Sequence, residues 1–149
     1  MAIPSETIRT EGTQVATNQK ATVVRAGAKF RSEQGSDYEP GISNETVGSK
    51  AVFLGMVTLP ADARTQAHKH EHHETALYML EGDECELWTG EQLQHRDTAR
   101  AGDFIYIPAN VPHVAVNRGE RSAVFIASRN DPTAQESVVL YPEMDKLVP

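Results

Sequence analysis

The residues of this chain best suited to chemistry lie in one short tract, His68-Lys69-His70-Glu71-His72-His73-Glu74, which holds four of the six histidines. Imidazole is the commonest protein ligand of transition metals, and carboxylate often accompanies it. On an extended strand, His68 and His70 project from the same face. A short turn can bring Glu74 beside them, and His113 is available as a fourth ligand. The tract predicts a metal site on β-structure.

Two simpler interpretations of the tract are a solvated polar loop and an engineered tag. A tag is disfavoured because the tract is interrupted, lies in mid-chain and runs directly into the mainly apolar segment 75–80. The solvated loop stays open on the tract alone.

Composition excludes several classes of protein. The chain has 149 residues, enough for one domain with a sizeable core. Its formal net charge of −7 and its lack of a basic run argue against nucleic acid or anionic membrane as partners. The single cysteine, Cys85, permits neither an intrachain disulfide nor a thiolate metal cage. Without a signal-like start, and with its most apolar stretch at only 51–59, the protein is expected to be cytoplasmic.

The elements that must position the histidines are short strands, because β-like segments recur about every ten residues between glycines and prolines. No stretch has a strong helical period. This pattern is typical of an all-β antiparallel sandwich or small barrel. The expected strands are residues 22–24, 51–59, 65–70, 75–80, 84–88, 93–99, 104–107, 112–117, 122–127 and 137–140.

The chain divides into three expected parts: an N-terminal arm at 1–21, a β-barrel at 22–142 and a C-terminal tail at 143–149. The arm is polar, and residues 143–147 suit one helical turn. Within the barrel, the Gly- and Ser-rich segment 27–49 predicts edge strands or a lid.

The division into lid and barrel also suggests roles for individual side chains. The lid offers Arg31, Tyr38 and Glu39 as substrate contacts. Cys85 is interpreted as a buried small residue and not as a nucleophile. The larger apolar residues expected in the barrel core are Tyr78, Met79, Trp88, Phe104, Tyr106 and Phe125.

A second pattern, Gly-x5-Pro-x-Asn-x2-His-x3-Asn, runs from Gly102 to Asn117. With the histidine tract, it resembles the two motifs of the cupin family. In that family a histidine pair, a glutamate and a glycine are followed by Gly-x5-Pro-x-Gly-x2-His-x3-Asn. The matching residues here are His68, His70, Glu74 and Gly82 for the first motif, and Gly102, Pro108, His113 and Asn117 for the second. The resemblance covers about a third of the chain.

The resemblance implies a small antiparallel double-stranded β-helix, or cupin jelly roll. It also implies one divalent transition metal per chain, held by His68, His70, Glu74 and His113. Fe, Mn, Ni, Co and Zn all suit these ligands, and the residue types do not choose among them. Asn117 is interpreted as a turn-capping amide and not as a ligand.

Three departures from the family pattern stand out. Asp62 occupies the place of the first-motif glycine, and Asn110 replaces the second-motif glycine, which Asn tolerates well. Seven residues separate Glu74 from Gly82 where the family has six, so counting back from Gly82 puts Thr75 at the acid position. A one-residue slip turns a strand side chain to the other face. A three-histidine site therefore stays open, although we favour Glu74 as ligand.

Two further histidines of the tract are interpreted as turn residues near the mouth of the site. These are His72 and His73, and His73 is the better candidate to support or replace a metal ligand. His95 is expected to be exposed on a polar strand.

The function indicated by the resemblance is a metal-dependent enzyme acting on a small organic molecule, with a dioxygenase of the quercetin- or diketone-cleaving kind as the first hypothesis. Glu74 is the candidate catalytic base. One alternative is a non-redox isomerase, lyase or decarboxylase, and another is a non-catalytic ligand-binding protein. The expected assembly is a homodimer, because exposed sheet edges need covering.

Overall fold

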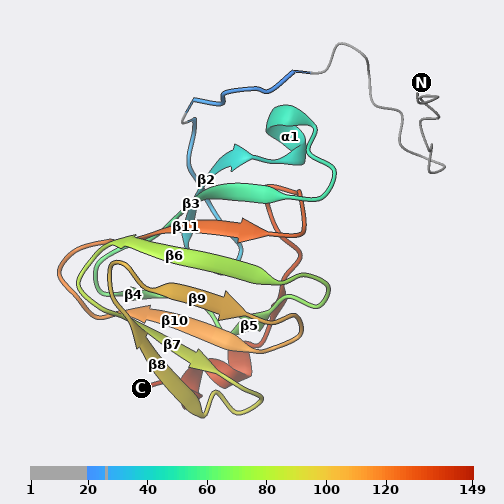
Figure 1. Cartoon of the computed structure of the whole chain (residues 1–149). Coiled ribbons are helices and arrows are strands. Elements are labelled where there is room, and N and C mark those ends of the chain that lie inside the picture. Colours follow the sequence, from blue (N-terminus) through green and yellow to red (C-terminus); the bar gives the residue numbers. More distant parts are fainter. Residues whose placement is uncertain (1–19, 26) are drawn as a thin grey trace, which may run out of the picture.

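The computed structural model describes residues 20–25 and 27–149, and its strands form two antiparallel sheets (Figure 1). In the first sheet the order is β1 (Phe30–Arg31), β2 (Asp37–Ile42), β3 (Phe53–Leu59), β11 (Ala123–Arg129), β6 (Thr75–Glu81) and β9 (Phe104–Ile107). In the second sheet the order is β12 (Val139–Leu140), β5 (His68–Lys69), β10 (His113–Asn117), β7 (Cys85–Thr89) and β8 (His95–Ala99). The short strand β4 (Ala63–Arg64) also pairs with β10.

Two short helical segments complete the fold. The helix α1 (Asn44–Val47) follows β2 and starts at a capping box in which Ser43 and Thr46 exchange hydrogen bonds. The 3₁₀ helix η1 (Pro142–Leu147) confirms the helical turn expected near the C-terminus. Within residues 20–25 and 27–149, no helix has the length and apolar character needed to cross a membrane.

The main core lies between the two sheets, because alternate side chains of each strand point inward. Phe53 and Met79 of the first sheet are fully buried there, together with Cys85 from the second sheet. A second cluster packs on the other face of the second sheet, where Val114 and Val116 meet Met144 of η1. The strand β10 is therefore covered on both faces.

Most expected strands are present, with ends that coincide or are shifted by at most two residues. The span expected at 65–70 is broken into β4 and β5, and the segment 27–49 contains β1, β2 and α1. No strand forms at 22–24, so that expectation is wrong. The expected arm at 1–21 lies outside the described residues except for its last two positions.

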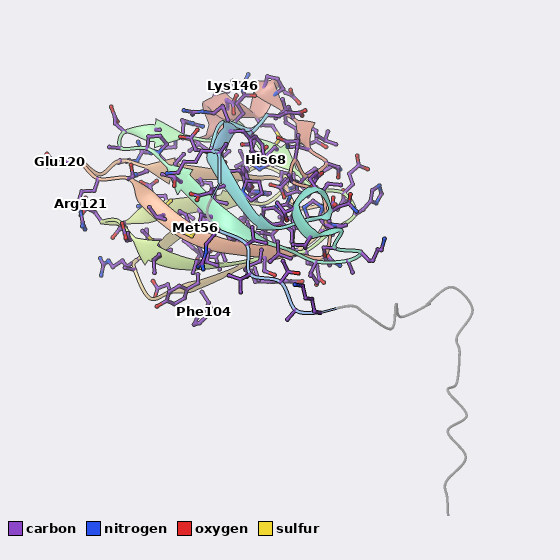
Figure 2. The ribbon with its side chains drawn as sticks, turned by 90° about the horizontal axis from the view of Figure 1, so that it is seen from above. Met56, His68, Phe104, Glu120, Arg121 and Lys146 are labelled. Carbon is purple, nitrogen blue, oxygen red and sulfur yellow. The ribbon has the colours of Figure 1, made fainter. Side chains whose placement is uncertain are left out.

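Two residues of β9 that were expected in the core, Phe104 and Tyr106, lie on the surface. Ile105 and Ile107 face inward, but Phe104 is 83% exposed and Tyr106 is 60% exposed. Phe104 projects from the edge of the molecule in Figure 2, and its ring lies 5.0 Å from that of Tyr78. An apolar run on an edge strand still alternates, so its outward residues stay on the surface.

Two departures from the family glycines prove compatible with the backbone. Asp62 has a φ of 52° and Asn110 a φ of 66°, both in the left-handed region where glycine is favoured. The backbone N–H of Asn110 donates to the carbonyl of His70 at 2.6 Å, which joins the two histidine-bearing segments. Asp and Asn tolerate this conformation better than most residues, so both turns keep the glycine geometry.

Asn117 has the capping role expected for it. Its buried side-chain amide lies within hydrogen-bond distance of the carbonyls of Leu59, Pro60 and Arg121, and its oxygen accepts from the backbone N–H of Gly119. These contacts tie the end of β10 to the end of β3 and to the turn before β11.

Candidate metal centre

Three histidines converge between the sheets. His68 on β5 and His113 on β10 are direct partners across the two strands, and their ring centroids are 4.2 Å apart. His70 follows β5, with its ring 5.0 Å from His68 and 5.2 Å from His113. All three are buried, and their ligating nitrogens lie within 4.8 Å of one another. His68, labelled in Figure 2, is only 3% exposed.

The proton of each imidazole is placed by a backbone carbonyl. The bonds join His68 Nδ1 to the Gln66 oxygen at 2.6 Å, His70 Nδ1 to the Ser137 oxygen at 2.8 Å, and His113 Nδ1 to the Val111 oxygen at 2.9 Å. A carbonyl oxygen only accepts, so each Nδ1 must carry the hydrogen. In the neutral ring the lone pair is then on Nε2, where a metal would bind.

Burial keeps these rings neutral. Desolvation is the largest influence on all three and lowers the pKa of His68 and of His70 below the ordinary value. The same effect lowers the pKa of His113 to about 4. Metals bind the neutral imidazole, so the rings are already in the ligating form near neutral pH. Three such rings fit a divalent transition metal, without selecting which one.

Glu74 does not lie with the histidines, which corrects the expectation that it is a ligand and a base. Its side chain is on the surface and accepts a hydrogen bond from the Tyr106 hydroxyl at 2.6 Å. Its backbone N–H donates to Asn130 Oδ1 at 2.9 Å.

The reason is the alternation of β6. Thr75, Leu77 and Met79 point inward, and Thr75 and Leu77 line the cavity beside the histidines. Glu74 immediately precedes the strand, and its side chain lies on the outer side. The position of the family's glutamate, when counted back from Gly82, is therefore taken by Thr75, and Thr75 points inward.

A carboxylate does reach the histidines, but it comes from Glu136, in the segment between β11 and β12. Its Oε2 accepts from His73 Nε2 at 2.9 Å and lies 3.6 Å from His70 Nε2. Its Oε1 accepts from Gln34 Nε2 at 2.8 Å and from the Tyr38 hydroxyl. Nothing in the sequence marks Glu136, because it belongs to no motif and lies 63 residues from His73.

Glu136 is held as an anion although it is buried. Burial alone raises the pKa of a carboxyl group. Here the hydrogen bond from His73, the nearby His70 ring and the charge of Arg129 outweigh it and hold the pKa of Glu136 well below its usual range. Arg129 is itself buried, with its Nε 3.6 Å from Oε2 and its guanidinium carbon 3.7 Å from the centre of the Phe53 ring.

The other candidate residues are distributed as follows. His73 is buried beside His70, whereas His72 and His95 are exposed. Of the expected lid contacts Arg31, Tyr38 and Glu39, Tyr38 lines the cavity, and Gln34 and Ser36 of the same segment line it as well. Cys85 is buried, and burial raises the pKa of its thiol to about 12, which agrees with its interpretation as a core residue.

The histidines line a cavity of about 80 Å³ that is partly open to solvent. Its apolar wall is formed by Val57, Leu59, Leu77, Ile105, Ile107 and Phe125. Two polar atoms of its lining residues are buried without a hydrogen-bond partner: Gln34 Oε1 and Thr75 Oγ1. An apolar wall with a few polar groups is the character of a small-molecule site.

Comparison with solved structures gives the same fold. A variant of oxalate decarboxylase from Bacillus subtilis matches with a TM-score of 0.60 and 21% identity, over 76% of this chain and 30% of that one. The polyketide cyclase RemF from Streptomyces resistomycificus matches with a TM-score of 0.60 and 20% identity, over 82% and 84%. The DMSP lyase DddQ from Ruegeria pomeroyi matches with a TM-score of 0.53 and 23% identity, over 64% of this chain and 46% of that one. This chain spans less than a third of the oxalate decarboxylase.

The sequence comparison is consistent with the structural one. No curated protein matches the sequence. Residues 55–128, which contain both histidine motifs, match the family described as "Cupin domain". Together with the two antiparallel sheets, this match shows that the chain carries a small domain of the cupin superfamily.

Proposed function

We propose that His68, His70 and His113 bind one divalent transition metal, and that the chain is an enzyme acting on a small, mainly apolar organic molecule. The observation that carries this proposal is the convergence of three buried, neutral imidazoles whose Nδ1 atoms are all held by carbonyls. A structural role alone does not require three such lone pairs to face one another.

The metal would supply Lewis acidity and open positions for substrate oxygens. The protein residues supply the rest. The aliphatic wall and Phe125 exclude water and pack against a flat or aliphatic skeleton. Gln34 Oε1 is free to accept a hydrogen bond from a substrate hydroxyl, and the Thr75 hydroxyl is free to donate one.

The reaction that we favour is oxygenation of an enol or a diol. Such a substrate has adjacent oxygens for the metal and an apolar remainder for the wall. Glu74 takes no part, because it lies outside the cavity. Glu136 is a weak base, since its pKa lies well below its usual range and far from neutral pH. These residues therefore offer little for a reaction driven by proton abstraction.

The second candidate is a non-redox reaction, such as decarboxylation, cyclisation or elimination. It is supported by the names of the similar structures, which include a decarboxylase, a polyketide cyclase and a lyase.

Oxygen consumption distinguishes the two candidates. The protein, loaded separately with Fe(II), Mn(II) and Ni(II), is mixed with a flavonol, a catechol and a β-diketone in an oxygen electrode. Oxygenation predicts substrate-dependent oxygen uptake that is absent in His113→Ala. Turnover under argon would instead support the non-redox reaction. Binding of these compounds without any turnover would contradict an enzymatic role for this substrate class.

A further inference from the structure

The contact between His70 and Glu136 is not explained by hydrogen bonding. His70 Nδ1 donates to the Ser137 carbonyl, so its Nε2 carries a lone pair in the neutral ring. That lone pair faces Glu136 Oε2, another acceptor, at 3.6 Å. Both side chains are buried, at 4% and 3% exposure, so solvent does not separate them. Two buried acceptors that face each other are unfavourable unless a donor or a cation satisfies both, and a metal ion at this place would do so.

The separation from His70 also suits two ligands of one ion. The ligand atom of Glu136 lies within 4.8 Å of those of His70 and His73 but not of all three histidines of the centre, so the carboxylate must shift toward His68 and His113 when the ion binds. Ligand atoms bound to the same metal at about 2.1 Å lie roughly 3 to 3.5 Å apart in tetrahedral or octahedral arrangements. Oε1 of Glu136 already accepts from Tyr38 and Gln34, whereas Oε2 has a hydrogen bond from His73 alone. Oε2 therefore keeps a free lone pair on the side of the histidines.

The segment that carries Glu136 is fixed to the site at two successive residues. The Ser137 carbonyl orients His70, and the adjacent carboxylate meets His73. Tyr38 of β2 and Arg129 at the end of β11 hold the carboxylate from the other side. These contacts keep the carboxylate charged and close to the histidines without the metal.

We propose that Glu136 supplies the anionic ligand of the metal centre through Oε2, in the place that the sequence pattern assigns to Glu74. This inference rests on the proposed three-histidine centre and adds a fourth protein ligand from outside both motifs. With it, the buried charge of a divalent ion is partly neutralised. His73 supports the carboxylate and is not itself a ligand, because its Nε2 carries the hydrogen that Oε2 accepts.

The test is a metal titration against a competing chelator, with Zn(II) as the metal. Glu136→Gln keeps the shape and removes the charge, and Glu74→Gln is the matched control on the surface. We expect Glu136→Gln to lose about tenfold or more in affinity. Glu74→Gln should stay within about twofold of the wild type. Wild-type affinity in Glu136→Gln would overturn the inference.

A second measurement covers the case in which Glu136→Gln does not fold. A crystal structure of the Zn(II)-loaded wild type should place Oε2 at about 2.0 to 2.2 Å from the metal. A separation of more than about 3 Å from the metal would overturn the inference even without the variant.

Failure of the inference and failure of the proposed centre give different results. If Glu136 is not a ligand, His68→Ala still loses Zn(II) while Glu136→Gln retains it. If the centre itself is wrong, the wild type and His68→Ala bind Zn(II) equally weakly, and both the proposed centre and the role of Glu136 are overturned.

Discussion

At the scale of single residues, the centre depends on which nitrogen of each histidine carries the proton. Three carbonyls, from Gln66, Val111 and Ser137, settle this question before any metal arrives. Because the rings are also buried, the cost of arranging the proposed ligands would already be met during folding. The same burial makes protonation of these rings unfavourable, which has a consequence for stability.

The metal-free protein should lose stability as the pH falls from about 7 to about 4. The pKa of His113 is lowered from 6.5 to about 4, so in this window the unfolded chain binds more protons than the folded one. The free energy of unfolding therefore rises with pH, by about 3 kcal/mol at most from this residue. Denaturant titrations at several pH values measure the slope. His113→Gln should flatten it, whereas the exposed His95→Gln should leave it unchanged; equal slopes in all three proteins would contradict the account.

The turn at Asn110 allows a test of backbone strain at one residue. Its φ of 66° is left-handed, so Asn110→Ala should destabilise the fold by about 1 kcal/mol. Asn110→Gly should be neutral within about 0.5 kcal/mol, because glycine adopts this conformation freely. Thermal unfolding of the two variants compares them directly. Equal stability of Ala and Gly at this position would show that the left-handed turn is absent.

At the scale of elements, strand β6 decides which side chain enters the site. Residues 75, 77 and 79 point inward, so Glu74 cannot. The seven residues between Glu74 and Gly82, one more than in the family pattern, already pointed to Thr75 as the inward residue. The spacing from His70 pointed to Glu74, so the sequence alone left both possibilities open. Only the observed direction of β6 chooses between them.

Thr75 should therefore affect the substrate and not the fold. Its hydroxyl is buried without a partner, so Thr75→Val removes an unsatisfied group and should leave the free energy of unfolding unchanged or raise it by up to about 1 kcal/mol. Metal affinity should not change, while the binding of a hydroxylated ligand should weaken about tenfold or less. Calorimetric titration of the metal-loaded variant measures both. Destabilisation by more than about 1 kcal/mol would mean that the hydroxyl has a protein partner.

The sequence predicted local features well and long-range ones poorly. His68 and His70 could be predicted to share a strand face from their two-residue spacing, and His113 from the resemblance to the second cupin motif. Glu136 could not, since a segment without motif reaches the site only after β11 and β12 have formed. Phe104 was expected inside because an apolar run does not reveal that its strand lies at a sheet edge.

At the scale of the whole molecule, the first sheet ends at β9 with Phe104 and Tyr106 on the surface. We expect a homodimer, since such edges and apolar side chains are usually covered. Sedimentation equilibrium should give about twice the 16.4 kDa of one chain. Phe104→Glu should shift the equilibrium toward monomer, whereas Leu147→Glu, at an exposed site on η1, should not. A wild-type monomer at micromolar concentration would contradict this expectation.

The central claim, that three histidines of the cupin domain bind one metal, is tested most directly by elemental analysis of protein purified without added metal. We predict about one divalent transition metal per chain in the wild type and in His95→Ala, and almost none in the triple variant His68→Ala/His70→Ala/His113→Ala. Zn or Ni from the medium is the expected occupant if the native metal is Fe or Mn, because late first-row ions bind such sites more tightly. Full occupancy in a folded triple variant would contradict the account.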